Sequence, residues 1–259
     1  MNDMRSTGFV KPDLDPVDIA AAFTLLTRIP LPVNHVRAGE RAGQAAWAYP
    51  VVGAVLGLIA GAFAITLHWI GVSTGIASAC GLGTLMLMTG ALHEDGIADC
   101  ADGFGGGATP ARRLEIMKDS RIGAFGAAAL IVVLLARWSG YGAVIEGNWL
   151  GAFVAAGAVS RLPMVLVMYG MPLARRNGFA ATVGMVTAPT AIVAGLLALF
   201  LGLLCLGLLV IPLVLVAVLS CLPLCWLAWR RIGGYSGDVL GGCQQIAEIA
   251  ALAVLSAAL

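Results

Sequence analysis

The chain has 259 residues, of which 60% are hydrophobic and 11% are charged, and its formal net charge is +1. A soluble domain of this size needs more polar side chains on its surface, so the composition argues against a soluble α/β enzyme. The near-neutral charge and apolar content also argue against a nucleic-acid binder and a disordered chain. The sequence therefore predicts a protein that resides in a lipid bilayer.

The apolar residues form long runs, and about 20 such residues cross the roughly 30 Å hydrocarbon core as a helix. Seven runs qualify, which predicts an all-α polytopic bundle of about seven transmembrane helices, with residues 1–259 as one domain. The expected spans are Ala46–Ile70, Gly75–Leu92, Gly123–Val144, Leu150–Gly170, Thr187–Leu208, Leu209–Trp229 and Val239–Leu259. The run from Val186 to Trp229 is too long for one span, so we divide it near Leu208, upstream of Pro212.

The basic residues predict the orientation of these spans. Apart from Arg137 and Arg161, every Lys and Arg lies in the N-terminal segment 1–45 or in the loops after the second, fourth and sixth spans. The positive-inside rule places these parts in the cytoplasm and the C-terminus outside. We therefore expect a multi-pass protein of the bacterial inner membrane with cytoplasmic active-site loops.

Arg137 and Arg161 lie inside the third and fourth expected spans, where a charged side chain needs a partner. One interpretation is a structural ion pair. The other is an arginine that lines a polar pocket for an anionic substrate, because the planar guanidinium suits phosphate oxygens. We favour the second interpretation for Arg161, since Pro163 frees backbone carbonyls nearby.

Segment 93–122, the expected cytoplasmic catalytic loop, concentrates acidic, basic and glycine residues. If the second span continues as a helix, Asp95, Asp99 and Asp102 lie at about 0°, 40° and −20° around its axis. Such carboxylates repel each other, and Mg²⁺ would offset this repulsion because it binds carboxylates together with substrate phosphates. Glu94 points about 100° away and is a fourth candidate ligand. A solvated acidic loop is the alternative.

Basic residues and glycines follow this cluster. Thr109 and the proline after it predict the start of a short surface helix that runs to about Arg121. Arg113, Lys118 or Arg121 would neutralise phosphate charge, and the amides of a glycine-rich turn would approach the same phosphate. The glycines concerned include Gly103 and Gly105. The alternative for the basic residues is a simple anchor at the membrane surface.

The connection before the last span carries Ser236 and Asp238. Either residue could simply cap the last helix. Because this connection is expected on the same membrane face as Asp95, both residues are also candidates for completing the polar site. Gln244 and Glu248 follow at helical spacing, so the same face of the last span is expected to line the cavity. His93 adjoins the cluster and is a candidate for proton transfer or an interfacial residue.

A metal, a phosphate pocket and a cytoplasmic membrane face together indicate phosphoryl transfer, with a carboxylate as base toward an alcohol. Two adjacent stretches also resemble one family. They are Leu92-His93-Glu94-Asp95-Gly96-Ile97-Ala98-Asp99 through Asp102-Gly103, and Arg113-Leu114-Glu115-Ile116-Met117-Lys118-Asp119-Ser120-Arg121-Ile122-Gly123. Further matches are at 23–30, 49–53 and 233–241. The chain resembles the cobalamin synthases, or adenosylcobinamide-GDP ribazoletransferases.

The resemblance implies a late step of vitamin B12 biosynthesis that requires Mg²⁺. Adenosylcobinamide-GDP would react with α-ribazole or its 5′-phosphate, giving adenosylcobalamin or its 5′-phosphate and GMP. It also implies that Asp95, Asp99 and Asp102 hold Mg²⁺ on the pyrophosphate. The ribazole 3′-hydroxyl would attack the phosphorus bonded to cobinamide. Association with other corrinoid-assembly enzymes and self-association are left open.

Two other functions compete with this interpretation. One is another Mg²⁺-dependent membrane alcohol phosphotransferase of the CDP-alcohol type, although this chain lacks the D-x2-D-G-x2-A-R start of that motif. The other is an ion-coupled transporter. It is less favoured because coupling sites in transporters lie near the bilayer midplane, whereas this cluster is expected at the cytoplasmic boundary.

Overall fold

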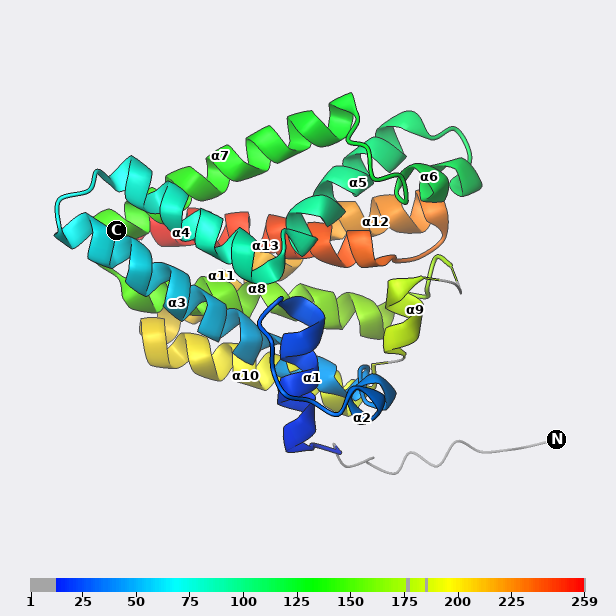
Figure 1. The fold of residues 1–259 in the computed structure, drawn as a ribbon, viewed down its shortest axis with the longest axis horizontal. Coiled ribbons are helices and arrows are strands. Elements are labelled where there is room, and N and C mark those ends of the chain that lie inside the picture. The colour runs from blue at the N-terminus through cyan, green and yellow to red at the C-terminus, as the bar shows by residue number, and fades with distance from the viewer. Residues whose placement is uncertain (1–12, 176–177, 185, 259) are drawn as a thin grey trace.

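The computed structural model describes residues 13–175, 178–184 and 186–258. These residues form helices joined by short connections, and no strand occurs among them apart from an isolated bridge between Leu173 and Tyr235. The long helices lie side by side in a bundle (Figure 1). The predicted all-α class is confirmed.

Five helical segments among the described residues are long and apolar enough to cross a membrane, and a sixth arises if a bent pair is one span. This confirms a polytopic membrane protein, whereas the count of seven stays a prediction. The five are Gln44–Trp69 with η1 (Gln44–Ala48) and α3 (Tyr49–Trp69), α7 (Ala124–Glu146), α8 (Leu150–Gly170), the stretch Ala188–Ile232, and α13 (Gly237–Ala257).

The stretch Ala188–Ile232 is not one straight helix. As such it would measure about 68 Å, twice the hydrocarbon thickness. Its four pieces are α10 (Ala188–Leu206), η2 (Gly207–Leu209), α11 (Val210–Ser220) and α12 (Leu222–Ile232). Gly207 has a φ of 59°, a conformation that favours glycine, and it ends α10. The helix break therefore lies next to Leu208, where the sequence predicts it.

The bent pair consists of α4 (Thr74–Thr89) and α5 (Leu92–Gly106), which meet at 88°. The expectation that the second span continues as one helix into the carboxylate cluster is therefore wrong. Gly90 and Ala91 both have positive φ, 66° and 57°, which ends α4 and redirects the chain. A Cβ on Gly90 would overlap the Arg28 side chain, so glycine also makes room for a neighbouring segment.

Helices α3 and α8 pack backbone against backbone. A Cβ on Gly53 would overlap the carbonyl of Gly157, and a Cβ on Gly157 would overlap the carbonyl of Gly53. One turn along α3, Gly57 lies in the same way against the backbone of Phe153. Lipid tails are as apolar as side chains, so membrane helices associate through close packing and not through the hydrophobic effect. Small residues at a crossing allow this close packing.

Gly53→Ala is therefore expected to separate α3 from α8 and lower stability by about 1–3 kcal/mol, as overpacking does. Thermal unfolding in detergent would measure the loss. Gly83 on α4 is the matched control, since a Cβ there meets nothing within 4 Å. Equal midpoints for Gly53→Ala and Gly83→Ala would contradict the prediction.

The N-terminal part of the described chain folds over one flank of the bundle as α1 (Pro16–Leu26) and α2 (His35–Glu40). Asp18 of α1 is fully buried and accepts hydrogen bonds from Arg41 Nε at 2.6 Å and from Trp47 Nε1 at 2.9 Å. Burial alone would raise the pKa of Asp18, but these hydrogen bonds outweigh it and hold the pKa below its usual value. Asp18 thus fixes α1 to the end of α2 and to η1.

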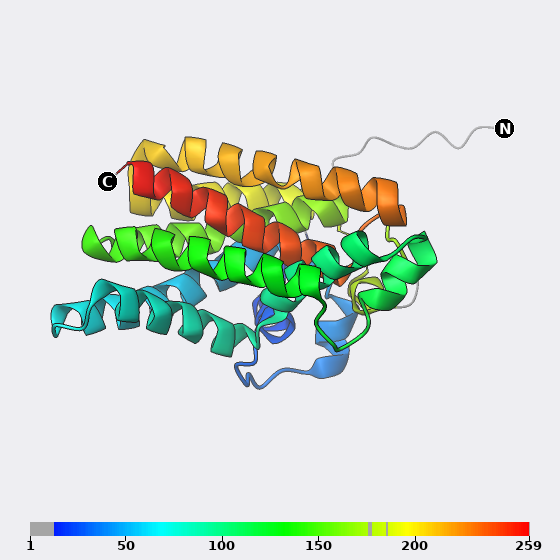
Figure 2. The ribbon, with the colours of Figure 1, turned by 90° about the horizontal axis from the view of Figure 1, so that it is seen from above.

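The remaining short helices are α6 (Pro110–Ile116) and α9 (Phe179–Val183). The side chain of Thr109 accepts from the Arg112 amide, which confirms the predicted start of α6, but the helix ends at Ile116 and not near Arg121. Segment 93–122 is thus largely helical and not a loop. Figures 1 and 2 show that α5, α6, α9 and the connection from α12 to α13 gather at the bundle end opposite the C-terminus.

Candidate active site

The carboxylates predicted from the sequence lie on α5 at this end of the bundle. Asp95 is exposed, whereas Asp99 and Asp102 are half-buried. Gly96 lets α5 approach the first turn of α13, because a Cβ at this position would touch the Asp238 backbone at 2.8 Å. Asp95, Asp102 and Asp238 all repel the charge of Asp99. The structure therefore brings a fourth carboxylate, from α13, to the predicted cluster.

Asp102 also has a structural task. Its two carboxylate oxygens accept the backbone amides of Gly123 at 2.7 Å and Gly126 at 2.8 Å. These amides belong to the first turn of α7, whose N–H groups have no partner within the helix. A Cβ on either glycine would overlap the carboxylate. Asp102 therefore joins α5 to α7, and its role as a metal ligand stays a prediction.

Asp95 and Asp238 open onto a pocket of about 160 Å³, here called the end pocket. Its lining comes from α1, α3, α5, α8, α9 and α13 and from the connections that precede α9 and α13. The lining includes Leu25, Tyr49, His93, Asp95, Met164, Met168, Leu173, Arg175, Ala181, Tyr235, Ser236 and Asp238. Ser236 hydrogen-bonds Asp238 at 3.0 Å and also caps α13, so both roles considered for it are compatible.

Arg175 is a pocket residue that the sequence does not single out. One of its guanidinium nitrogens lies 3.9 Å from an Asp238 carboxylate oxygen. The backbone positions it: Ala174 donates to the carbonyl of Tyr235 at 2.8 Å, and Tyr235 donates to the carbonyl of Pro172 at 2.9 Å. The only available signal was its place among the basic loop residues, because the pairing depends on two connections that are distant in sequence.

Arg113 and the glycines beside it hold helices together. The buried Arg113 donates to the carbonyls of Arg231 at 3.0 Å and Ala108 at 3.1 Å, which binds α6 to the end of α12. Gly103 makes room for the Met117 side chain, and Gly105 for Phe125. Both glycines lie within α5, so their amides belong to the helix. The expectation that these three residues bind phosphate is corrected accordingly.

Lys118 and Arg121 are exposed after α6, and neither lines the end pocket. Arg121 forms an ion pair with Asp119 at 2.6 Å. Hydrogen bonds from Arg121 lower the pKa of Asp119 to about 2. Arg121 would therefore have to leave Asp119 to reach a phosphate, and the catalytic role of both basic residues stays a prediction.

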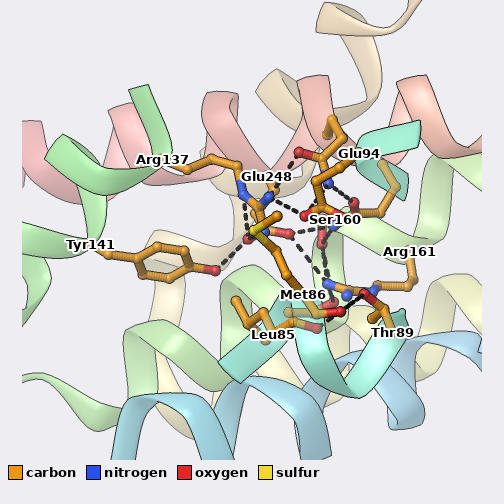
Figure 3. Close-up of polar contacts among 12 residues, drawn as sticks. Leu85, Met86, Thr89, Glu94, Arg137, Tyr141, Ser160, Arg161 and Glu248 are labelled. Carbon is orange, nitrogen blue, oxygen red and sulfur yellow. Dashed lines mark hydrogen bonds and ion pairs between the residues drawn. The ribbon is translucent and has the colours of Figure 1, made fainter. Parts of the chain in front are cut away.

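Behind the pocket, four helices contribute charges to a buried network (Figure 3). Arg137 of α7 donates to Glu94 at 2.5 Å and to Glu248 of α13 at 3.0 Å. Tyr141 also donates to Glu248. Arg161 of α8 lies 3.4 Å from the other Glu248 oxygen. Gln244, Gln245 and Ser160 complete the network. Its two arginines and two glutamates balance in formal charge.

Two sequence interpretations change with this network. Glu94 points into the bundle toward Arg137, so it is not a flanking metal ligand. Arg161 is 2% exposed and donates to Ser160 at 2.9 Å and to the Gly157 carbonyl at 3.1 Å. It therefore follows the structural alternative and does not line a substrate pocket. Glu248, expected on a cavity face, belongs to the same buried network.

The carboxylates fit Mg²⁺ by their chemistry. Within the described ranges, no three His, Cys, Asp or Glu side chains form a ready-made metal cage. Mg²⁺ commonly takes only one or two carboxylates and completes its coordination with waters and substrate phosphates. Asp95 and Asp99 are one helical turn apart, and Asp238 lies across from them. This donor set suits a magnesium ion that binds together with its substrate.

Fold and site together define a polytopic helical membrane enzyme with an acidic pocket at one end of its bundle. The profile of the cobalamin-5-phosphate synthase family matches residues 18–256. Three adenosylcobinamide-GDP ribazoletransferases are similar along most of their length. The one from Mesorhizobium japonicum is 42% identical, covering 93% of both chains. That from Azorhizobium caulinodans is 39% identical, covering 91% of this chain and 93% of its own.

The relative from Ralstonia pickettii is 40% identical over 86% of this chain and 88% of its own. No solved structure matches the chain. The chain belongs to the cobalamin-5-phosphate synthase family, as its resemblance to the cobalamin synthases predicts. The family and these relatives indicate adenosylcobinamide-GDP ribazoletransferase activity in vitamin B12 biosynthesis.

Proposed function

We propose that the carboxylates at the end pocket carry out the transfer of adenosylcobinamide phosphate from adenosylcobinamide-GDP to α-ribazole or its 5′-phosphate. The observation that carries this proposal is the convergence of Asp95, Asp99 and Asp238 beside a pocket that also contains Arg175. Carboxylates can accept a proton from an alcohol, and an arginine can hold a phosphate oxygen. Both groups are what this transfer requires.

In the proposed reaction, Asp95 or Asp99 accepts the proton of the ribazole 3′-hydroxyl. The hydroxyl oxygen forms a bond to the phosphorus attached to cobinamide. The phosphoanhydride bond to GMP breaks, and GMP leaves with the electron pair. Arg175 is placed to hold a phosphate group near Asp238, which it already approaches at 3.9 Å. Whether Asp95 or Asp99 is the base is left open.

We further propose that Mg²⁺ is the cofactor and that Asp95 and Asp99 hold it, with Asp238 as a neighbouring carboxylate. When bound, the ion would offset the negative charge of the pyrophosphate and of the departing GMP. The repulsion that Asp99 experiences from the carboxylates around it supports a cation at this position. Association with other corrinoid-assembly enzymes and self-association stay predictions.

We place the end pocket on the cytoplasmic face of the bacterial inner membrane, with the C-terminus on the opposite face. The basic residues around the pocket support this orientation through the positive-inside rule. A cysteine-free background with Cys introduced at Ala111 or at Ala258 tests it. An impermeant maleimide added to intact spheroplasts should label only the Ala258→Cys variant. The reverse pattern would contradict the orientation.

The activity is tested with purified protein in nanodiscs, supplied with adenosylcobinamide-GDP, α-ribazole and Mg²⁺. We expect equal amounts of GMP and of the completed corrinoid. EDTA should abolish both, and added Mg²⁺ should restore them. A corresponding nucleotide-activated alcohol and diacylglycerol form the comparison reaction for a phospholipid-synthesising enzyme. Absence of GMP with the corrinoid substrate, while a homologous transferase turns over, would refute the proposal.

A further inference from the structure

We propose that the end pocket binds the benzimidazole base of α-ribazole and that His93 donates a hydrogen bond to the free ring nitrogen of this base. This inference rests on the proposed function and assigns one substrate to one part of the site. The base is two fused apolar rings with two methyl groups and a single free acceptor nitrogen. A matching site needs apolar walls, one hydrogen-bond donor and an opening toward the reacting groups.

The walls of the end pocket are largely apolar. Met164 and Met168 of α8, Leu25 of α1 and Leu173 contribute aliphatic or thioether surface, and Tyr49 contributes a ring. Methionines adapt to irregular ligand shapes and make favourable sulfur contacts with aromatic rings. The volume of about 160 Å³ is close to that of a cavity that binds benzene, roughly 150 Å³, so the pocket can take a small aromatic ring system but not a corrin ring.

His93 supplies the second observation that points to a ligand. It lines the pocket, is 2% exposed, and its Nε2 has no hydrogen-bond partner among the described residues. A buried polar atom without a partner is unfavourable, and such groups in native proteins are usually completed by water or a ligand. Among the groups of the two substrates, the free nitrogen of the benzimidazole suits His93 best, because it is a single acceptor on an otherwise apolar ring.

The alternative occupants fit less well. Guanine carries donors and acceptors along its edge, and apolar walls would leave most of them unpaired. A lipid chain would fill the apolar space but would leave His93 Nε2 without a partner. With the base in the pocket, the ribose lies at the polar opening near Asp95 and Asp238. Arg175 is then near the ribose as well as near Asp238, so the phosphate group that it holds would be the 5′-phosphate when the ribazole carries one.

The first test narrows the pocket. Ala181→Leu adds three carbons to its lining on α9, whereas Ala111→Leu makes the same change at an exposed position on α6. In nanodiscs with Mg²⁺, we expect Ala181→Leu to raise KM for α-ribazole at least tenfold and to leave KM for adenosylcobinamide-GDP within twofold. Ala111→Leu should change neither. A rise confined to the KM for adenosylcobinamide-GDP, or no rise at all, would overturn the inference.

The second test widens the pocket, so the inference does not depend on one variant that folds poorly. Met168→Ala should raise kcat/KM for the α-riboside of a three-ring naphthimidazole at least threefold relative to α-ribazole. For the hydrogen bond, His93→Gln keeps a donor and His93→Leu does not. We expect Gln to retain at least a third of the wild-type kcat/KM for α-ribazole and Leu to lose tenfold or more, mainly in KM.

Unchanged base preference in Met168→Ala, or equal losses in the two His93 variants, would overturn the corresponding part of the inference. These outcomes are read against wild-type turnover. If the wild-type protein releases no GMP, the proposed function fails. If it turns over and the variants do not shift the KM for α-ribazole, only the assignment of the pocket fails.

Discussion

Asp95→Asn is expected to lower GMP release by at least about a hundredfold, the scale at which removal of one electrostatic group affects a charged transition state. Asp95 lies at the opening of the end pocket, and its side chain is exposed. The amide keeps the shape of the carboxylate but loses its charge and its ability to accept a proton. Because no buried contact is lost, the variant should insert and fold as the wild type does.

Turnover of purified Asp95→Asn in nanodiscs, measured at saturating substrate and over a range of Mg²⁺ concentrations, tests this expectation. Glu115→Gln is the matched control, since Glu115 is an exposed carboxylate on α6 whose ion pair with Arg112 lies at the surface. It should retain wild-type turnover. Asp95→Asn with more than a tenth of the wild-type rate would remove Asp95 from the catalytic groups.

Arg137→Met is expected to destabilise the protein by about 3–5 kcal/mol, the usual effect of removing one partner from a buried ion pair. Methionine is of similar length but leaves Glu94 and Glu248 facing each other without the guanidinium between them. Both carboxylates are buried, so their charges would lose a partner without becoming exposed to solvent. Unfolding in mixed detergent and SDS would measure the difference.

Arg112→Met provides the control for this second prediction. Its ion pair with Glu115 is exposed and should contribute only about 0–1 kcal/mol. Adding Glu94→Gln to Arg137→Met should recover part of the lost stability, because Arg161 still pairs with Glu248 and the amide removes the one negative charge left unbalanced. If Arg137→Met were as stable as Arg112→Met, the network would not be the connection that secures α5 to α7 and α13.

The composition and the motif around Asp95 were sufficient to predict a helical membrane protein, its family and the placement of the carboxylates at one end of the bundle. The long apolar runs predict the membrane helices, and the few charged residues stand out against these runs and so locate the carboxylate cluster. The helix break beside Leu208 was predictable for the same reason, since the run was too long for one span. Asp238 could be proposed because helix ends on one membrane face share one surface.

The bend between α4 and α5 could have been predicted from Gly90, which directly follows the apolar run and is a common helix-ending residue. The buried network could not be predicted. It combines side chains from α5, α7, α8 and α13, and only the folded bundle determines that Arg161 meets Glu248. Arg113 was misread for a similar reason: its partners are backbone carbonyls, which carry no signal in the side-chain pattern.

The 88° bend at Gly90 and Ala91 also determines which part of the bundle the carboxylates of α5 reach. In a straight continuation of α4, the seven residue steps from Asp95 to Asp102 would rise about 10 Å along the axis of that helix. The carboxylates would then project as a column away from the bilayer. With α5 turned by 88° at the end of α4, this helix instead packs against the first turn of α13, so Asp95 and Asp238, which are distant in sequence, share the end pocket.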